Sequence, residues 1–307
     1  MKPSVVVVGS LNKDLVIHVE QFPREGETLL GTGLLETTGG KGANQAVALG
    51  KLRTPVSMIG KVGSDSNASK LIDSLQQAAV DTGNLLLSES STGMAIVTVN
   101  KAGSNHVVVI PGANYELTAD DIEKHRKAIE QCEIVVLQLE IPVATVQYTL
   151  RLAKELGKIT VLNPAPAQML TDEILRHVDF LIPNEHELFS ISGIRVTDKA
   201  SLQEAAHSIL NRGVQALVIT LGEKGCCYAN RDIVKFYPAR TVEAKDTTAA
   251  GDSFIAGFVA GYLKHRDVDS AIEYAQIAAS ITVTRHGAQC SLPTFEEVEQ
   301  LSCSVDS

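Results

Sequence analysis

The stretch AKDTTAAGDSF, residues 244–254, holds the residue types that a group-transfer site needs. A β-prone segment precedes it and apolar or small residues at helical spacing follow it, which predicts a loop-to-helix junction. The backbone N–H groups of Ala249, Ala250 and Gly251 would then be free to bind an anion at the positive end of the helix dipole. Asp252 would repel that anion, but it fits a base that takes the proton of a hydroxyl attacking phosphorus. The alternative is an ordinary acidic residue in a first helical turn.

A second candidate is TGGKGANQAVA, residues 38–48, where glycines precede a predicted helix that extends to about Lys51. Glycine lets the backbone and a ligand come close together. Lys41 and Asn44 each carry several hydrogen-bond donors, which suits a polyhydroxylated ligand. The spacing matches neither a Walker A loop nor a GxGxxG dinucleotide motif. The alternative is a plain helix N-terminus with a solvated lysine.

Polar residues follow many of the predicted strands. The carboxyl ends of parallel strands share one edge of an open sheet, where ligands bind. The residues that this pattern places at that edge are Asn12, Asp14, Glu140, Asn163, Asn184, Glu187 and Gly222. TLGEKG, residues 220–225, adds a glycine-bracketed turn that either binds the phosphates of a nucleotide through backbone N–H groups or is a simple hairpin turn.

Strands and helices alternate along most of the chain, which predicts a mainly parallel α/β sheet covered by helices on both faces. The predicted strands are residues 4–8, 56–62, 134–139, 159–162, 180–182 and 216–220, and the predicted helices include residues 69–79, 117–130, 143–156 and 202–211. Residues 15–35 and 92–110 instead contain short alternating strands, which we expect in a small separate sheet. We therefore expect one α/β domain over residues 1–307, with these two segments inserted in it.

Composition excludes several classes of protein. The chain has 307 residues and a net charge of −9, so a nucleic-acid partner has no electrostatic support. No apolar run is long enough for a membrane span, and MKPSVVVVGS at the start predicts a strand rather than a signal peptide. The cysteines are odd in number and without CxxC pairs: Cys132, Cys226, Cys227, Cys290 and Cys303. We expect neither a disulfide framework nor a structural zinc site, and a cytoplasmic protein.

Together these stretches resemble the PfkB-type carbohydrate kinase family. AKDTTAAGDSF is similar to the C-terminal signature of that family, and TTGGKGANQAVALG is similar to its N-terminal signature. The resemblance extends over the chain through GSLNKD, NPAP, IPNEHE, TLGEKG and TRHGAQCS. Within the family the closest resemblance is to kinases that use ATP to phosphorylate the 5-hydroxyl of D-ribose. It implies an open, mainly parallel sheet with helices on both faces, a β-sheet lid formed by residues 15–35 and 92–110, and a homodimer through paired lids.

The resemblance also implies a role for each site residue. Asp252 would be the general base, beside an anion hole formed by the N–H groups of Ala249, Ala250 and Gly251. The residues implied to hold D-ribose are Asn12, Asp14, Gly40, Lys41, Asn44, Glu140 and Asp252. Those implied along the ATP site are Asn184, Thr220, Leu221, Gly222, Glu223, Lys224, Gly225, Gly251 and Gln276. Glu187 would act on Mg²⁺ through water, and the implied K⁺ site comprises Asp246, Thr248, Thr282, Arg285, Gly287 and Ser291.

Three positions depart from the family pattern. Lys13 replaces a small residue, and we expect it to point to solvent. Gln276 stands where His or Asn is frequent, and Cys290 stands in the predicted cation loop where Pro is common.

Two other functions stay open. The first is a sister kinase for deoxyribose, fructose or a nucleoside. A nucleoside would need aromatic lid residues to stack its base, and the lid segments contain only Phe22, while deoxyribose would have less use for both Asn12 and Asp14. The second is a non-catalytic sugar-binding protein, which would not need Asp252.

Overall fold

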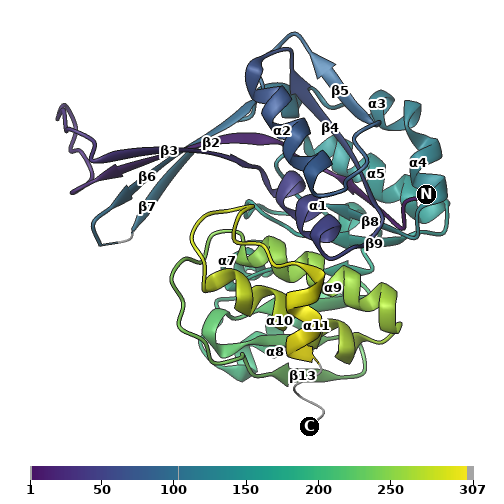
Figure 1. Ribbon diagram of the computed structural model, residues 1–307. Coiled ribbons are helices and arrows are strands. Elements are labelled where there is room, and N and C mark those ends of the chain that lie inside the picture. Colours follow the sequence, from purple (N-terminus) through teal and green to yellow (C-terminus); the bar gives the residue numbers. More distant parts are fainter. Residues whose placement is uncertain (1, 103, 303–307) are drawn as a thin grey trace.

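The computed structural model describes residues 2–102 and 104–302, so Cys303 lies outside the described residues. Its largest element is a nine-stranded sheet with the order β13-β12-β11-β10-β9-β8-β1-β4-β5 (Figure 1). The strands are β1 Val5–Val8, β4 Val56–Gly63, β5 Leu85–Ser88, β8 Ile134–Leu137, β9 Ile159–Leu162, β10 Phe180–Leu181, β11 Ala216–Thr220, β12 Cys226–Ala229 and β13 Val234–Tyr237. Pairing is parallel from β11 to β5 and antiparallel between β11, β12 and β13, which confirms the mainly parallel sheet.

The central strand β1 shows why both faces of the sheet are covered. Its four valines are fully buried, and because side chains alternate along a strand, Val5 and Val7 enter one core while Val6 and Val8 enter the other. The first core is covered by α1 Lys41–Lys51, α2 Ser66–Gln77, α9 Ala250–His265, α10 Val268–Val283 and α11 Phe295–Ser302. The second is covered by α3 Ala119–Lys124, α4 Arg126–Gln131, α5 Val143–Glu155, α6 Asp172–Leu175, α7 Glu185–Ser192 and α8 Lys199–Leu210.

The prediction of one helix over residues 117–130 is wrong, because the segment forms the two short helices α3 and α4. At the junction, the Nδ1 atom of His125 lies 2.8 Å from the carbonyl oxygen of Asp121, which a continuous helix would use for its own ladder. The backbone N–H of His125 donates instead to Ile122 O at 3.0 Å, which tightens the turn and ends α3. At its start, α3 is capped by Thr118 and Asp121, which form a capping box.

A separate four-stranded sheet, with the order β3-β2-β6-β7, extends away from the main body (Figure 1). Its strands are β2 Asn12–Val19, β3 Gly33–Gly39, β6 Gly93–Asn100 and β7 Asn105–Ile110. The expected small second sheet is therefore confirmed, although residues 20–32 form no strand in it. Leu34, Leu35, Val107 and Val108 are exposed on this sheet.

The expectation that Lys13 points to solvent is wrong. Its side chain is 6% exposed, and its Nζ atom lies 3.1 Å from a carboxylate oxygen of Glu36. Alternation along β2 places Lys13 on the face opposite to Asn12 and Asp14. Helix α2 packs on that face, where its Lys70 also pairs with Glu36. Coverage by a helix from elsewhere in the chain therefore buries this lysine.

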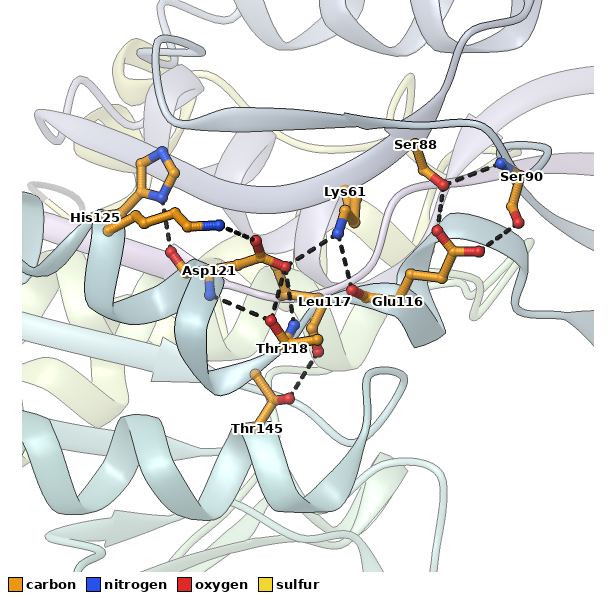
Figure 2. Close-up of polar contacts among 10 residues, drawn as sticks. Lys61, Ser88, Ser90, Glu116, Leu117, Thr118, Asp121, His125 and Thr145 are labelled. Atoms are coloured by element: carbon orange, nitrogen blue, oxygen red, sulfur yellow. Dashed lines mark hydrogen bonds and ion pairs between the residues drawn. The ribbon is translucent and has the colours of Figure 1, made fainter.

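A polar cluster joins β4 to the short 3₁₀ helix η1 (Gly112–Glu116) and to α3 (Figure 2). The buried carboxylate of Asp121 accepts hydrogen bonds from Lys61 Nζ and Thr118 Oγ1, both at 3.0 Å. Burial would raise the pKa of Asp121, but the hydrogen bonds from Lys61 and Thr118 outweigh it and lower that pKa to about 2. Lys61 also donates to the carbonyl of Glu116 at 2.9 Å, so this pair fixes the end of η1.

We predict that Asp121→Asn lowers the free energy of unfolding by about 3 kcal/mol, because it leaves the Lys61 ammonium, whose side chain is only 15% exposed, without its carboxylate. Asp120→Asn is the matched control, since Asp120 is exposed in the same helical turn and its loss should change stability by less than about 0.5 kcal/mol. In the wild type, the lowered pKa of Asp121 gives stability that is present above pH 3.8 and is lost as the pH falls towards 2. Urea unfolding at pH 7 and pH 3 measures both effects, and equal losses in the two variants at pH 7 would contradict the prediction.

Candidate active site

Helix α9 begins at the carboxyl edge of the main sheet, at the junction that the sequence predicts. Its N-cap residue Ala249 has a φ angle of 60°, a strained conformation for a residue with a Cβ atom. The N–H of Ala250 donates to Thr247 O at 3.2 Å. Within the described residues, the N–H groups of Ala249, Gly251 and Asp252 have no acceptor in the protein. The helix therefore presents three free donors at its positive end.

Asp252 lies in the first turn of α9, but it is not the exposed acidic residue of the alternative interpretation. Its side chain is buried, with 7% of its surface exposed. Two consecutive residues of α1 donate to its carboxylate: Asn44 Nδ2 lies 3.0 Å from Oδ2, and Gln45 Nε2 lies 2.9 Å from Oδ1. Burial raises the pKa of Asp252, while Lys41 and these two amides oppose the rise.

The N-terminus of α1 lies against the end of β1 and is capped from outside. A carboxylate oxygen of Glu140 accepts hydrogen bonds from Lys41 N at 3.1 Å and from Ser10 Oγ at 2.5 Å. Gly42 allows this approach, since a Cβ atom there would lie 2.6 Å from Ser10 N. Burial by itself would lower the pKa of Lys41, but nearby carboxylates, Asp252 first, outweigh it and raise that pKa. Lys41 therefore lies at this site as a cation stabilised by nearby carboxylates, and it lines the cavity described below.

The two polar residues at the start of β2 face this same edge. Asn12 is 2% exposed, and its Oδ1 atom accepts from Asn114 Nδ2 at 2.8 Å. Burial raises the pKa of Asp14 to about 7, and the charges of Glu140 and Asp252 add to the rise. The Oδ1 atoms of Asp14 and Asn44 are buried without a donor. Because an orphaned buried acceptor costs free energy, both atoms fit a ligand that brings O–H donors.

A cavity of about 230 Å³ opens beside Asp252. Its lining is Lys41, Asn163, Ala165, Ile182, Asn184, Glu187, Thr220, Thr247, Ala249, Gly251, Asp252 and Ile255. A Cβ atom on Gly251 would meet no protein atom within 4 Å, so the free donors of α9 face open space. At the cavity wall, Asn184 and Glu187 form a capping box, with Glu187 Oε2 accepting from Asn184 N at 2.9 Å. Burial raises the pKa of Glu187.

The turn TLGEKG joins β11 to β12 as an antiparallel hairpin, which is the simpler of its two interpretations. Residues 222–224 form one turn of 3₁₀ helix, and the φ angles of Gly222 and Gly225 are 59° and 99°, which favours glycine. Thr220 lines the cavity, whereas Leu221, Gly222, Glu223, Lys224 and Gly225 are not in its lining. Gln276 lies apart from it and donates to the carbonyls of Pro238 at 3.0 Å and Tyr237 at 3.3 Å.

The two segments of the expected cation site lie side by side. Lys245 N and Asp246 N both donate to Val283 O, at 2.7 and 3.2 Å. Asp246 Oδ2 accepts from Gly287 N at 2.8 Å, and its Oδ1 accepts from Thr248 N and Oγ1 at 2.9 and 2.6 Å. Other members of the set bond elsewhere: Thr282 Oγ1 donates towards Ser253 Oγ at 2.7 Å, Ser291 Oγ to Ala288 O at 2.7 Å, and the Arg285 side chain to Glu297.

Three residues of the site were absent from the residues proposed from the sequence: Ser10, Gln45 and Asn114. Gln45 follows Asn44 directly, so its place in the glycine-rich stretch was a usable signal. Asn163 follows β9 and was noted only as one of the polar residues at strand ends. Asn114 had no signal, because its partners at residues 11 and 12 are more than a hundred positions away.

Comparison with known proteins adds three findings. The pfkB family carbohydrate kinase model matches residues 2–295. A ribokinase of Staphylococcus aureus is 39% identical over 98% of this chain and 100% of its own length, and a deoxyribokinase of Salmonella typhi is 37% identical over 96% of this chain and 97% of its own. The solved structure of Arabidopsis thaliana ribokinase complexed with ribose and ATP matches with a TM-score of 0.91 and 28% identity, over 98% of this chain and 99% of that one.

We predict that Asp14→Asn raises the melting temperature of the ligand-free protein, and by more at pH 8 than at pH 5. The folded state raises the pKa of Asp14 from 3.8 to about 7 and so keeps its proton where the unfolded chain has lost it. Wild-type stability therefore falls as the pH rises through that window, by at most about 4 kcal/mol at about 1.4 kcal/mol for each unit. Thermal unfolding at both pH values measures the difference.

Asp73→Asn is the control for this experiment, because Asp73 is exposed on α2. An Asp14→Asn variant that is less stable than the wild type at pH 8 would contradict the prediction.

Proposed function

Because the chain belongs to the pfkB family of carbohydrate kinases, we propose that it transfers the terminal phosphoryl group of ATP to the 5-hydroxyl of D-ribose, giving D-ribose 5-phosphate and ADP. The observation that carries the proposal is the cavity where a buried carboxylate, Asp252, lies beside the free N–H groups of α9. These are a base for a hydroxyl and a site for a phosphate. Relatives named ribokinase that cover almost the whole chain support ribose as the acceptor.

The chemical step needs a stronger nucleophile than a neutral hydroxyl. Asp252 accepts the proton of the sugar 5-hydroxyl as that oxygen bonds to the terminal phosphorus. The bond from this phosphorus to the bridging oxygen breaks, and ADP leaves with the bonding electrons. Negative charge on the transferring group is stabilised by the N–H groups of Ala249 and Gly251, which are already oriented before the reaction. Protonated Asp252 then releases its proton to solvent as the product leaves.

The sugar would occupy the space where buried acceptors lack donors. Sugar hydroxyls would supply the missing donors for Asp14 Oδ1 and Asn44 Oδ1. Asn44 also donates to Asp252, so it would link the bound sugar to the base. The residues proposed to hold D-ribose are Asn12, Asp14, Gly40, Lys41, Asn44, Glu140 and Asp252.

The strongest alternative is a kinase of the same family for another small sugar, because a deoxyribokinase is also 37% identical to this chain. Deoxyribose lacks one hydroxyl, so one of the buried acceptors would stay unpaired in its complex, at a cost of about 1–3 kcal/mol. A non-catalytic sugar-binding protein is disfavoured, since it would gain nothing from burying Asp252 beside an anion site.

ATP would enter from the other side of Asp252, along the cavity. The residues proposed for it are Asn184, Thr220, Leu221, Gly222, Glu223, Lys224, Gly225, Gly251 and Gln276. A magnesium ion fits the chemistry of the cavity wall, because Glu187 presents carboxylate oxygens there and Mg²⁺ is usually held through its waters and substrate phosphates. Glu187 would hold it through water, and the ion would neutralise phosphate charge.

A potassium ion is proposed beside the anion site, held by Asp246, Thr248, Thr282, Arg285, Gly287 and Ser291. The hydrogen bonds from residues 245 and 246 to Val283, and from Gly287 to Asp246, support a loop pair that could surround one cation with oxygens. The thiol of Cys290 bonds within this loop to His286 O at 3.2 Å. The ion would hold the peptide groups of the loop in place without touching the phosphates.

Assembly and location are further proposals. We propose that residues 1–307 act as one domain whose lid segments, 15–35 and 92–110, cover the sugar and pair in a homodimer. Exposed apolar side chains on β3 and β7 support this pairing: Leu34, Leu35, Val107 and Val108. We propose a cytoplasmic enzyme. The described cysteines are free thiols, and no helix in the described ranges has the length and apolar composition to cross a membrane.

We predict ATP-dependent phosphorylation of D-ribose, and its loss in Asp252→Asn. ADP release is measured with D-ribose, 2-deoxy-D-ribose, D-fructose and adenosine, and D-ribose should have the highest kcat/KM. Loss of a general base lowers kcat by about 10²–10⁴-fold, while calorimetry should find ribose and ATP still bound. Asp232→Asn, at an exposed turn, is the control. A higher kcat/KM for another sugar would replace ribose as the substrate, and an Asp252→Asn rate within a few-fold of wild type would remove Asp252 as the base.

We also predict activation by K⁺ that Na⁺ and tetramethylammonium replace poorly. Because the proposed ion holds the loop beside Ala249 and Gly251, the effect should appear in kcat or in the KM for ATP more than in ribose affinity. Initial rates are compared in the three chloride salts at constant Mg²⁺ and ionic strength, in wild type and in Asp246→Ala. Equal wild-type rates in all salts would exclude the cation site, and a K⁺ response that persists in Asp246→Ala would remove Asp246 from it.

A further inference from the structure

Two buried glutamine amides form a hydrogen-bonded chain that ends on the carboxylate of Asp252, the proposed base. Gln138, which follows β8, donates from Nε2 to the Oε1 atom of Gln45 on α1 at 2.6 Å. Gln45 in turn donates from Nε2 to Oδ1 of Asp252 on α9 at 2.9 Å. Both glutamines are fully buried. Three elements that are distant in the sequence therefore meet in one hydrogen-bonded chain that ends on the carboxylate.

The carboxylate of Asp252 at the end of this chain sets the direction in which each hydrogen bond is donated. An ionised carboxylate only accepts hydrogen bonds, so Gln45 must present its NH₂ group to Asp252. The carbonyl of Gln45 then faces Gln138, which must present its own NH₂ group. The two amide dipoles are thus aligned with their positive ends towards Asp252, and such aligned bonds strengthen one another.

At the other end of the chain, this arrangement leaves a buried oxygen without a hydrogen-bond donor. Gln138 Oε1 is buried and has no donor. It lies over the backbone of Gly9, where an added Cβ atom would come within 2.0 Å of it. An apolar residue at position 138 would remove this orphaned oxygen, but it would also leave Gln45 Oε1 without its donor. Gln138 therefore leaves its own buried oxygen unpaired while its NH₂ group holds the carbonyl of Gln45 in place.

Gln45 has one further contact that restricts the orientation of its side-chain amide. Its Nε2 atom also lies 3.4 Å from Oδ1 of Asn163, whose Nδ2 donates to Ile182 O at 3.1 Å. The amide of Gln45 is thus held by an acceptor on each side of its NH₂ group and by a donor on its carbonyl. Gln45 touches the carboxylate, and Gln138 acts only through Gln45.

We propose that Gln45 and Gln138 are positioning residues that act in series, Gln138 orienting Gln45 and Gln45 holding the carboxylate of Asp252 in the orientation that receives the hydroxyl proton. The proposal rests on the proposed phosphoryl transfer, and it assigns to residues outside the sugar and nucleotide contacts a part in the chemical step. Asn44 holds the other oxygen of the carboxylate, so loss of Gln45 would free the group to rotate about its remaining contact.

The test is a double-mutant cycle with Gln45→Met, Gln138→Met and the double variant, since methionine has a similar shape and no amide. Removing a hydrogen bond to a charged group costs about 1.5–3 kcal/mol, so kcat of Gln45→Met should fall by about 10–150-fold. The KM for D-ribose should stay within a few-fold of wild type. Gln138→Met should lower kcat by a smaller factor and change the melting temperature little, because it removes the orphaned oxygen of Gln138 but leaves Gln45 Oε1 without its donor.

Action in series predicts that the double variant has the kcat of Gln45→Met alone, since Gln138 then has nothing to orient. Multiplied losses in the double variant would overturn the series arrangement. Thr149→Val is the matched control, because it removes a buried hydroxyl on α5, far from the base, and should change only the melting temperature. If Gln138→Met behaved like this control, with a wild-type kcat, Gln138 would have only a structural role and the proposal would fail.

Failure of the proposed function is recognised separately. If the wild type phosphorylates another sugar, the cycle is measured with that sugar, because Gln45 and Gln138 act on Asp252 whichever hydroxyl attacks the phosphorus. If no sugar is phosphorylated, the crystal structures of wild type and Gln138→Met decide. The proposal requires the Gln45 amide to turn away from Asp252 in the Gln138→Met variant. An unchanged contact between Gln45 and Asp252 would overturn the proposal.

Discussion

The structure depends on holding several carboxylates around one lysine at the N-terminus of α1. The acidic side chains that raise the pKa of Lys41 are Asp252, Glu140, Glu187 and Asp14, and together they outweigh the burial that would lower it. They come from α9, the end of β8, α7 and β2, so the site exists only when all of these elements are in place. Like charges at short range repel, and the raised pKa of Asp14 reflects that repulsion as well as burial.

The surrounding structure compensates for this repulsion without removing it. One backbone N–H group at the start of α1, one hydroxyl and two amides bind the carboxylates of Glu140 and Asp252. Lys61 and Asp121 hold η1, which carries Asn114 to the buried oxygen of Asn12. Two buried acceptors remain unpaired, the Oδ1 atoms of Asp14 and Asn44. In the proposed complex, the hydroxyls of the sugar would supply their missing donors. Such local instability is typical of sites that bind a ligand.

The proposed base and the proposed phosphate site lie on one helix, and this arrangement would explain how a protein with a net charge of −9 can use ATP. The free N–H groups of α9 supply a local positive end, whatever the total charge of the chain. Asp252 lies two residues into the helix, close enough to these N–H groups to act on a hydroxyl that attacks a phosphate bound there. Amides of α1 restrict the rotation of its carboxylate. The relation of a helix terminus to a buried acid, and not the overall field, makes phosphoryl transfer possible here.

The sequence by itself determined the parts that depend on neighbouring residues. The valine run of β1, the junction before α9 and the glycine-rich start of α1 are local patterns, and the structure has each of them where it was expected. Only the tertiary structure decided that Lys13 is buried, because α2 packs over it. The break at His125 is a local contact with the carbonyl of Asp121, four residues earlier, which the helical pattern of residues 117–130 did not reveal. The partners of Gln45 and Asn114 lie 207 and 103 residues away, and those of Gln138 lie 93 away. A local pattern cannot specify such pairs, because the fold chooses which distant side chains share a buried volume.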